Sequence, residues 1–259
     1  MDFLRSRVGK LDAVTFSGGE PLMQTEFATE IFKKAKDLEG PILIHVLTKK
    51  GKGYLPAEEN TDKFHGVSGF NVKTGECIKK DNKDYSYIFG QKLSELAKND
   101  DKIVAVTAAM KDGTGLTCFA NEFPNRFFDV GISEGHCVTF ASGLSVMGKV
   151  PVVAIYSTFM QRAYDNIIHD VALQNLPVTF CLDRGGLVGE DGATHHGVFD
   201  LAYFSCVPNM IVASPMDELE LRNMLYSAVE TPTPYAIRYP RGCGMGVEWK
   251  GKPFEMIAT

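Results

Sequence analysis

The chain has 259 residues and a formal net charge of −5. Apolar residues make up 44% of it and charged residues 23%, which is typical of a globular protein that buries a core. Because the sequence contains no block of basic residues, neither nucleic acid nor a membrane surface is expected as a partner. The six cysteines form no CxxC pair, so we expect no zinc site and predict reduced thiols in a cytoplasmic protein.

The first segment, residues 1–27, reads MDFLRSRVGKLDAVTFSGGEPLMQTEF. It resembles the Ser-Gly-Gly-Glu-Pro segment of radical S-adenosylmethionine activating enzymes, which in that family contacts the amino end of S-adenosylmethionine. That family holds an iron–sulfur cluster with a CxxxCxxC motif, whereas the first cysteine here is Cys77, so no radical chemistry is expected. We predict that residues 1–28 are a foreign segment that forms a short strand and turn or is disordered.

The next residues are predicted to form one helix, one strand and a long loop. The helical pattern at 28–40 has Gly40 as its stop, and the apolar run PILIHVLT at 41–48 is typical of a buried strand. The loop at 49–76 is rich in Gly, Lys and Asn. A loop of this length is usually a functional segment or a linker.

Beyond residue 100, apolar runs alternate with helical stretches. The runs lie at 102–110, 127–132, 150–157, 176–183, 209–215 and 233–240. Helices are predicted over Glu134–Met147, Thr158–Asn175 and Met216–Glu230, the last with Asp217 and Glu218 in its first turn. Apolar strands separated by helices indicate an α/β fold with a doubly wound, mostly parallel sheet, whose ligands bind at the carboxyl ends of the strands.

One polar side chain at such a strand end is Glu134, in the motif DVGISEGHCVTFASG at 129–143. It lies where a helix is predicted to begin. The carboxylate is therefore either a partner of the helix dipole or an acid placed in a crevice for proton transfer.

The following strand is predicted to end at Tyr156, and Phe159 and Arg162 come soon after it. Arg162 has helical spacing to Asp165 and His169, so a packed polar network is the alternative to a functional role for these side chains. Phe159 by itself would be a core residue.

A third group of polar residues lies in the Gly-rich stretch at 182–200, LDRGGLVGEDGATHHGVFD. Arg184 suits bidentate recognition of an anion, and the glycines let the backbone approach a ligand closely. His195 and His196 stand near two acids, but adjacent histidines point apart, so we predict no metal site.

The last strand ends in IRYPRGCG at 237–244, where Arg238 and Arg241 are either surface charges or anion ligands. Together the strand ends carry an acid, arginines, histidines and aromatic rings, but no recognisable nucleophile of the chain itself. This combination favours a bound organic cofactor that acts on an anionic substrate.

The stretch from Asp129 to Phe204, including IYSTFMQRAYDNIIHD and DRGGLVGEDGATHHG, carries a specific resemblance. It closely resembles the pyrimidine-binding domain of the 1-deoxy-D-xylulose-5-phosphate synthase family, thiamine-diphosphate enzymes related to transketolase. The segment at 40–66 resembles the end of that family's first domain and its linker. The similarity extends over roughly residues 29–246.

The resemblance implies a division of the chain. Residues 29–80 are expected to be the tail of the first, diphosphate-binding domain with its linker. Residues 81–248 are expected to form the pyrimidine-binding domain, and 249–259 to begin a linker to an absent C-terminal domain.

The resemblance also implies a reaction, in which pyruvate is decarboxylated and its two-carbon unit is transferred to glyceraldehyde 3-phosphate. The product serves isoprenoid synthesis by the non-mevalonate route, and thiamine and pyridoxal synthesis. The implied cofactors are thiamine diphosphate and Mg²⁺, and a homodimer is expected. The family holds the magnesium with a Gly-Asp-Gly motif and a downstream Asn, and this chain lacks that motif.

Matching the motifs residue by residue assigns roles within this sequence. Glu134 matches the acid that hydrogen-bonds the aminopyrimidine and promotes its imino form, and Phe159 resembles the ring that stacks on it. The residues matching those that face the cofactor or its adduct are Tyr54, His65, Asp191 and His195. The residues matching the phosphate site of the acceptor are Arg184 and Arg241, with Tyr156 and Arg162 nearby. One departure is Gly135, where the family more often has Gln.

With half of the cofactor cleft absent, the chain alone is expected to bind thiamine diphosphate weakly and to be incomplete as an enzyme. One alternative is the pyrimidine-domain subunit of a split transketolase-like or 2-oxoacid dehydrogenase enzyme, whose partner chain would supply Gly-Asp-Gly. Another is a catalytically silent module that dimerises.

Overall fold

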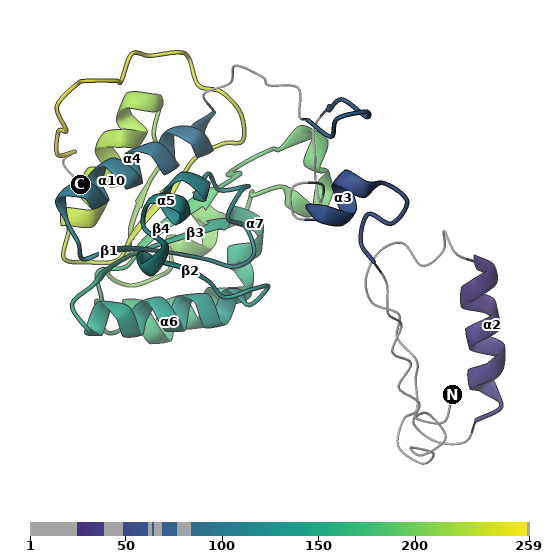
Figure 1. Cartoon of the computed structure of the whole chain (residues 1–259). Coiled ribbons are helices and arrows are strands. Elements are labelled where there is room, and N and C mark those ends of the chain that lie inside the picture. Colours follow the sequence, from purple (N-terminus) through teal and green to yellow (C-terminus); the bar gives the residue numbers. More distant parts are fainter. Residues whose placement is uncertain (1–24, 39–48, 62–63, 65–68, 77–83, 258–259) are drawn as a thin grey trace. The chain divides into compact units, whose positions relative to one another are not determined.

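The computed structural model describes residues 25–38, 49–61, 64, 69–76 and 84–257 (Figure 1). Internal contacts divide the chain into two units, Met1–Lys80 and Asp81–Thr259. The strand expected at 41–48 and most of the stretch that resembles radical enzymes lie outside the described residues.

The first unit contains two described helices, α2 (Thr25–Lys36) and α3 (Leu55–Glu59). Glu26 lies in the first turn of α2 and three lysines lie in its last turn, an arrangement that complements the helix dipole. The expectation of a turn or disorder is therefore wrong for the last residues of the opening stretch, which lie in a helix. The helix also ends before the predicted stop at Gly40.

The second unit is built on a six-stranded sheet with the order β2-β1-β3-β4-β6-β5. Every neighbouring pair of strands is parallel, as predicted. The strands are β1 (Ile103–Thr107), β2 (Phe127–Asp129), β3 (Val150–Tyr156), β4 (Thr179–Asp183), β5 (Ile211–Ala213) and β6 (Tyr235–Arg238). Each lies within a predicted apolar run, and the doubly wound α/β fold is confirmed.

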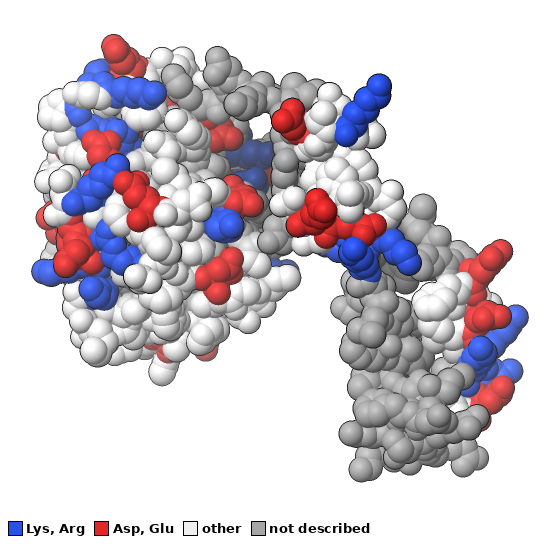
Figure 2. Space-filling model, in the orientation of Figure 1, with Lys and Arg blue, Asp and Glu red and all other residues white. Residues whose placement is uncertain are grey.

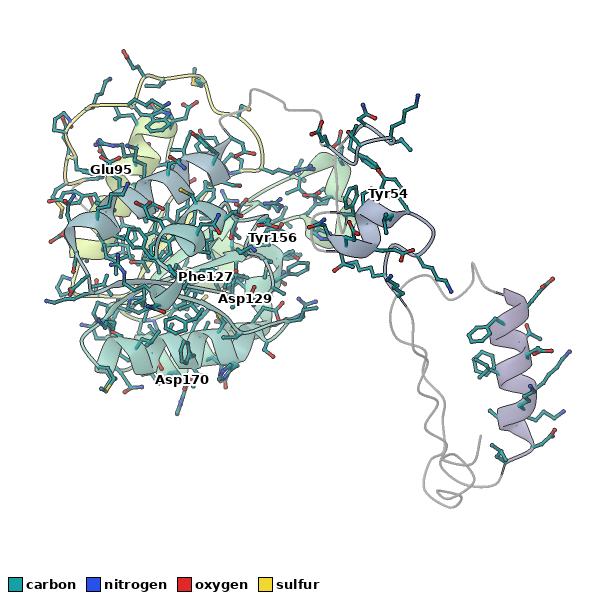
Figure 3. The ribbon with its side chains drawn as sticks, in the orientation of Figure 1. Tyr54, Glu95, Phe127, Asp129, Tyr156 and Asp170 are labelled. Carbon is teal, nitrogen blue, oxygen red and sulfur yellow. The ribbon has the colours of Figure 1, made fainter. Side chains whose placement is uncertain are left out.

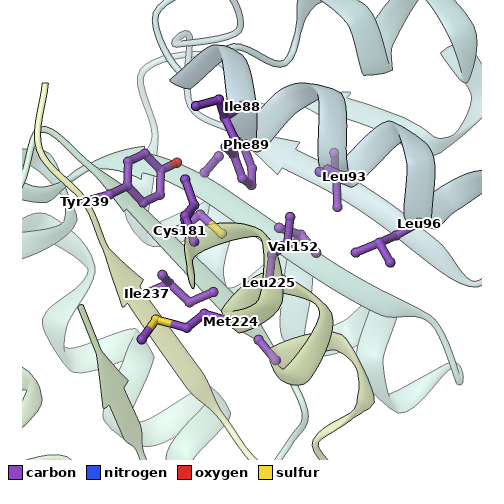
Figure 4. Close-up of a cluster of buried hydrophobic side chains, with 14 of the residues drawn as sticks. Ile88, Phe89, Leu93, Leu96, Val152, Cys181, Met224, Leu225, Ile237 and Tyr239 are labelled. Carbon is purple, nitrogen blue, oxygen red and sulfur yellow. The ribbon is translucent and has the colours of Figure 1, made fainter. Parts of the chain in front are cut away.

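Helices cover both faces of this sheet. The regular ones are α4 (Tyr85–Asn99), α5 (Thr117–Glu122), α6 (Glu134–Val146), α9 (Asp200–Phe204) and α10 (Glu218–Glu230). Side chains of α4, α5 and α10 pack on one face in a core that includes Phe89, Leu225 and Ile237 (Figure 4). Side chains of α6 and α9, and of the segment after β3, pack on the other face with Val153 and Phe180.

The segment after β3 differs from the single helix predicted over Thr158–Asn175. It consists of α7 (Ser157–Met160), the 3₁₀ turn η3 (Gln161–Ala163), α8 (Tyr164–Asn166) and the π-helical turn η4 (Ile167–Ala172). With the tight 3₁₀ turn η3 followed by the wide π-helical turn η4, this segment keeps four apolar side chains fully buried against the sheet, those of Met160, Ala163, Ile167 and Val171. Turns of π-helix are rare in proteins, and those that occur are often found at functional sites.

Helix α10 begins two residues later than predicted, because Asp217 is its N-cap and accepts a hydrogen bond from the backbone N–H of Glu220 at 2.9 Å. The residues that follow β6 return along this helix as an extended strap, residues 244–257. The side chain of Glu218 accepts bonds from two strap N–H groups, and that of Ser227 from one more. The buried guanidinium of Arg222 donates to the carbonyl oxygens of residues 252 and 253. The strap is thus fixed to α10 through its backbone, and its side chains Trp249, Phe254 and Ile257 pack against the same core.

On the face of the second unit seen in Figure 2, acidic and basic side chains are interspersed. None of the helices within the described ranges has the length and apolar character needed to cross a membrane.

Candidate active site

The predicted acid, Glu134, is the first residue of α6 and is 4% exposed. The turn before it is held by Asp129, the last residue of β2, whose Oδ1 accepts bonds from the N–H groups of Ala109 (2.8 Å) and Gly131 (3.0 Å). Gly131 has φ +71°, a conformation that favours glycine. The carboxylate Oε1 of Glu134 accepts a hydrogen bond from Nη1 of Arg162 at 2.7 Å.

The position after the acid shows why glycine fits there. A Cβ atom on Gly135 would lie 2.8 Å from Oδ1 of Asn166. The Asn166 amide is itself held by Thr139 at 3.1 Å and by Asp170 at 3.3 Å. In this chain the Asn166 side chain therefore occupies the space that a larger residue at 135 would enter.

Two stacked aromatic rings lie at the carboxyl end of β3, and Arg162 contacts both the Phe159 ring and the acid. Tyr156 ends this strand, at the same end of the sheet as Asp129 (Figure 3), and its ring stacks on Phe159 with centroids 5.7 Å apart. Burial raises the pKa of Tyr156, against the opposing effect of Arg184, whose Cζ lies 3.8 Å from the centre of the tyrosine ring. His195 meets the Phe159 ring edge to face at 5.2 Å. The structure thus brings together Tyr156, Phe159 and His195, which the sequence predicted to share a site.

Arg184 follows β4 and has φ +61°, a left-handed conformation uncommon for a non-glycine residue. Its Nη1 donates to Oδ1 of Asp183 at 2.9 Å and to the carbonyl oxygen of Gly113 at 2.8 Å. Asp183 is fully buried and also accepts a bond from Ser86 at 2.5 Å. Burial raises the pKa of Asp183 to about 6, although the positive charge of Arg184 opposes that shift.

The second predicted phosphate ligand, Arg241, shares a carboxylate with the first. Oδ1 of Asp191 lies 3.0 Å from Nη1 of Arg241, and its Oδ2 lies 3.4 Å from Nε of Arg184. Asp191 is carried by a loop of two short 3₁₀ turns, Gly189–Asp191 and Ala193–His195. The two guanidinium groups therefore converge on one anionic group.

Sequence reasoning missed the polar groups that support this loop. Asp200 is buried and its Oδ2 accepts bonds from Nε of Arg238 (2.8 Å) and from Oγ of Ser157 (2.9 Å). Arg238, weighed as a surface charge or an anion ligand, is instead paired within the fold. The available signal was position for Ser157, which directly follows the strand β3, whereas Asp200 begins the short helix α9 and carried no such signal.

The alternative weighed for Arg162, a packed network with Asp165 or His169, is not what the structure shows. Arg162 pairs with Glu134, and His169 lies 3.0 Å from Asp170 and is largely exposed. That contact raises the pKa of His169. The spacing of an α-helix, which predicted these partners, does not apply to Arg162 because it lies on the 3₁₀ turn η3.

Tyr54 belongs to the first unit, where its hydroxyl donates to the carbonyl oxygen of Val72 at 2.9 Å and its ring packs against Phe64 and Phe70. His65 lies outside the described residues. Within the described ranges, no group of three His, Cys, Asp or Glu side chains could hold a metal ion.

The side chains around Glu134 suit the aminopyrimidine half of thiamine diphosphate. A buried carboxylate can accept N–H bonds, and the flat face of Phe159 offers a stacking surface. The described residues fit this half of the cofactor, whereas they offer no comparable group for a metal-bound diphosphate.

The model of the family "Transketolase, pyrimidine binding domain" matches residues 81–245. The chain belongs to this family. It is 59% identical over 223 residues to 1-deoxy-D-xylulose-5-phosphate synthase of Aquifex aeolicus, covering 86% of the chain and 36% of that protein. It is 60% identical over 220 residues to 1-deoxy-D-xylulose-5-phosphate synthase 1 of Geobacter sulfurreducens, covering 84% and 34%. The predicted resemblance is confirmed, and the chain spans about a third of the length of these curated relatives.

Solved structures of transketolases resemble the chain as well. A structure titled "Split gene transketolase, inactive beta4 tetramer" has a TM-score of 0.55 and 32% identity, covering 61% of this chain and 51% of its own. Transketolase of Campylobacter jejuni has a TM-score of 0.58, covering 67% and 28%, and at 20% identity this likeness shows the fold alone.

Proposed function

We propose that this chain is the pyrimidine-binding part of a 1-deoxy-D-xylulose-5-phosphate synthase. The reaction is the decarboxylation of pyruvate and transfer of its two-carbon unit to glyceraldehyde 3-phosphate. The observation that carries the proposal is the buried Glu134 at the start of α6, linked through Arg162 to the Phe159 ring, in a chain 59% identical to such a synthase. Thiamine diphosphate, when bound, supplies the carbon atom that attacks pyruvate and carries the two-carbon unit.

In this proposal Glu134 accepts an N–H bond from the aminopyrimidine and takes and returns a proton at its carboxylate. The ring of Phe159 is the surface on which the pyrimidine stacks, and Tyr156 supports that ring from its own stacked position. The acid itself is buried away from water, which strengthens its hydrogen bond to the pyrimidine. Tyr54 and His65 are assigned to the cofactor side of the linker.

The acceptor's phosphate is assigned to Arg184 and Arg241, because two guanidinium groups that already converge on one carboxylate can instead hold a phosphate. Asp191 and His195 share a loop and are assigned to the substrate side of the site. Arg162 pairs with Glu134 in the ligand-free chain and is assigned a catalytic role near the substrate's phosphate site in the loaded enzyme.

Several wider features belong to the same proposal. The enzyme is a cytoplasmic homodimer that uses Mg²⁺ and acts in isoprenoid and thiamine precursor synthesis. The division of the chain is 1–28, 29–80, 81–248 and 249–259. The magnesium ligands come from another chain or segment, because this sequence has no Gly-Asp-Gly motif.

A second candidate function is the pyrimidine-domain subunit of a split transketolase-like enzyme. It is favoured by the 32% identity to a structure titled as a split gene transketolase. The two candidates share the cofactor site and differ in the substrate and in the source of the partner chain.

The test is reconstitution with the diphosphate-binding domain of the Aquifex aeolicus synthase as a separate chain. With thiamine diphosphate, Mg²⁺, pyruvate and glyceraldehyde 3-phosphate, we expect formation of 1-deoxy-D-xylulose 5-phosphate. Glu134→Gln should lower turnover at least about a hundredfold, because the substitution removes an acid–base group. The matched control, Glu122→Gln on the distant helix α5, should keep turnover within about twofold, since surface substitutions away from special features have small effects. Retained turnover in the Glu134 variant would refute the proposed proton role.

A further inference from the structure

Arg162 contacts the two groups that the proposed function reserves for the pyrimidine ring. Its Nη1 donates to Oε1 of Glu134 at 2.7 Å, and its Cζ lies 4.7 Å from the centre of the Phe159 ring. The first contact occupies the carboxylate and the second lies over the aromatic face. No other residue within the described ranges makes both contacts.

The chemistry of the two groups is similar. A guanidinium is planar, carries N–H donors in its plane and stacks on aromatic rings. The aminopyrimidine of thiamine is also planar, and its amino group carries N–H donors in the plane of the ring. A carboxylate beside an aromatic face can therefore accept either group.

The two partners of the ion pair differ in how freely they can move. The side chain of Glu134 is 5% exposed, whereas that of Arg162 is 57% exposed. Arg162 also stands on the three-residue turn η3, so its long side chain can swing into solvent without disturbing a regular helix. An incoming ring would thus displace the arginine while the carboxylate stays in place.

We propose that Arg162 is an internal stand-in for the pyrimidine ring, which holds Glu134 and Phe159 until the cofactor displaces it. This inference rests on the proposed function. The arginine satisfies a buried carboxylate that would otherwise be unpaired, a situation that costs stability. The same contact competes with the cofactor, so Arg162 lowers pyrimidine affinity while it protects the empty site.

The size of the effect follows from the kind of contact. A half-exposed ion pair and an exposed cation–π contact are each weak. Removing both contacts by substituting Arg162 should therefore tighten pyrimidine binding by roughly five- to tenfold. Losing the arginine should also lower the melting temperature of the ligand-free chain slightly, because Glu134 then lacks its partner.

The experiment measures binding of a neutral probe, 4-amino-5-hydroxymethyl-2-methylpyrimidine, to the full chain by NMR titration. A neutral probe avoids attraction or repulsion by the net charge of the protein. Arg162→Gln should bind it at least about fivefold more tightly than the wild type, and Arg162→Lys should lie between them, since an ammonium pairs with Glu134 but lacks the planar fork. Lys149→Gln, which also removes an exposed positive charge, should bind like the wild type.

Three results would overturn the inference. If Arg162→Gln binds the probe no more tightly than the wild type while Glu134→Gln weakens binding, Arg162 is not a competitor but the proposed function stands. If Arg162→Gln and Lys149→Gln tighten binding equally, the effect is one of general charge. If Glu134→Gln changes probe binding neither in the wild-type chain nor in the Arg162→Gln variant, the proposed pyrimidine site fails together with the inference. The same conclusion follows if no variant binds the probe.

Discussion

Replacement of Asp183 by Asn should change how the stability of this protein depends on pH. Asp183 is fully buried at the end of β4, where it accepts bonds from Ser86 and Arg184. Burial raises its pKa from 3.8 to about 6 in the folded chain. Between these two values the folded state holds a proton that the unfolded chain has released.

The sign follows from this difference in bound protons. A carboxyl group with a raised pKa in the folded state destabilises that state progressively as the pH rises from the unfolded value to the folded value. With about 1.4 kcal/mol for each pKa unit, the cost is near 1 kcal/mol at pH 4.5 and near 3 kcal/mol at pH 7.5. The free energy of unfolding of the wild type should therefore fall by about 2 kcal/mol relative to Asp183→Asn over this interval.

Urea unfolding of both proteins at pH 4.5, 5.5, 6.5 and 7.5 measures this difference directly. Asp101→Asn, at an exposed position, serves as the matched control and should run parallel to the wild type. A wild-type stability that stays constant or rises with pH relative to Asp183→Asn would refute the reasoning. It would mean that the pairing with Arg184 outweighs the cost of burial.

Two further predictions concern the arginines. Asp191→Asn should raise the affinity for inorganic phosphate about tenfold by calorimetry, because it frees Arg184 and Arg241 from their shared carboxylate. The control Glu190→Gln should change the affinity for phosphate less than twofold, because its exposed carboxylate lies 3.7 Å from Arg241 and contacts no second arginine among the described residues. If the two variants raise the affinity equally, Asp191 is not the group that competes with phosphate at this site. Arg222→Met should lower the free energy of unfolding by about 3 kcal/mol, since two carbonyl oxygens of the strap lose a charged donor. A loss below about 1 kcal/mol in urea unfolding would show that the strap is held mainly by its other bonds.

The sheet was predictable because its strands are apolar nearly throughout and alternate with helical segments, which is typical of parallel strands covered on both faces. The residues of β1 and β4 are all buried, in accordance with that reading. The alternation of tight and wide turns after β3 was not predictable. It depends on which side chains reach the sheet, and that is set by tertiary packing rather than by local pattern.

The candidate site was predictable where a strand end placed a polar residue, as for Glu134 and Arg184. The partners of these residues were not, because pairing joins positions far apart in the chain. Glu134 and Arg162 are 28 positions apart, and Ser86 and Asp183 are 97 positions apart. Helical spacing gave Arg162 nearer candidates, and no property of the sequence alone could choose the distant one.

The most direct measurement is a crystal structure of the chain together with a diphosphate-binding domain, thiamine diphosphate and Mg²⁺. The pyrimidine ring should stack on Phe159 with its N–H groups bonded to Glu134, and the Arg162 side chain should have left both. A pyrimidine ring bound elsewhere, with the contact between Arg162 and Glu134 intact, would contradict this account of the site.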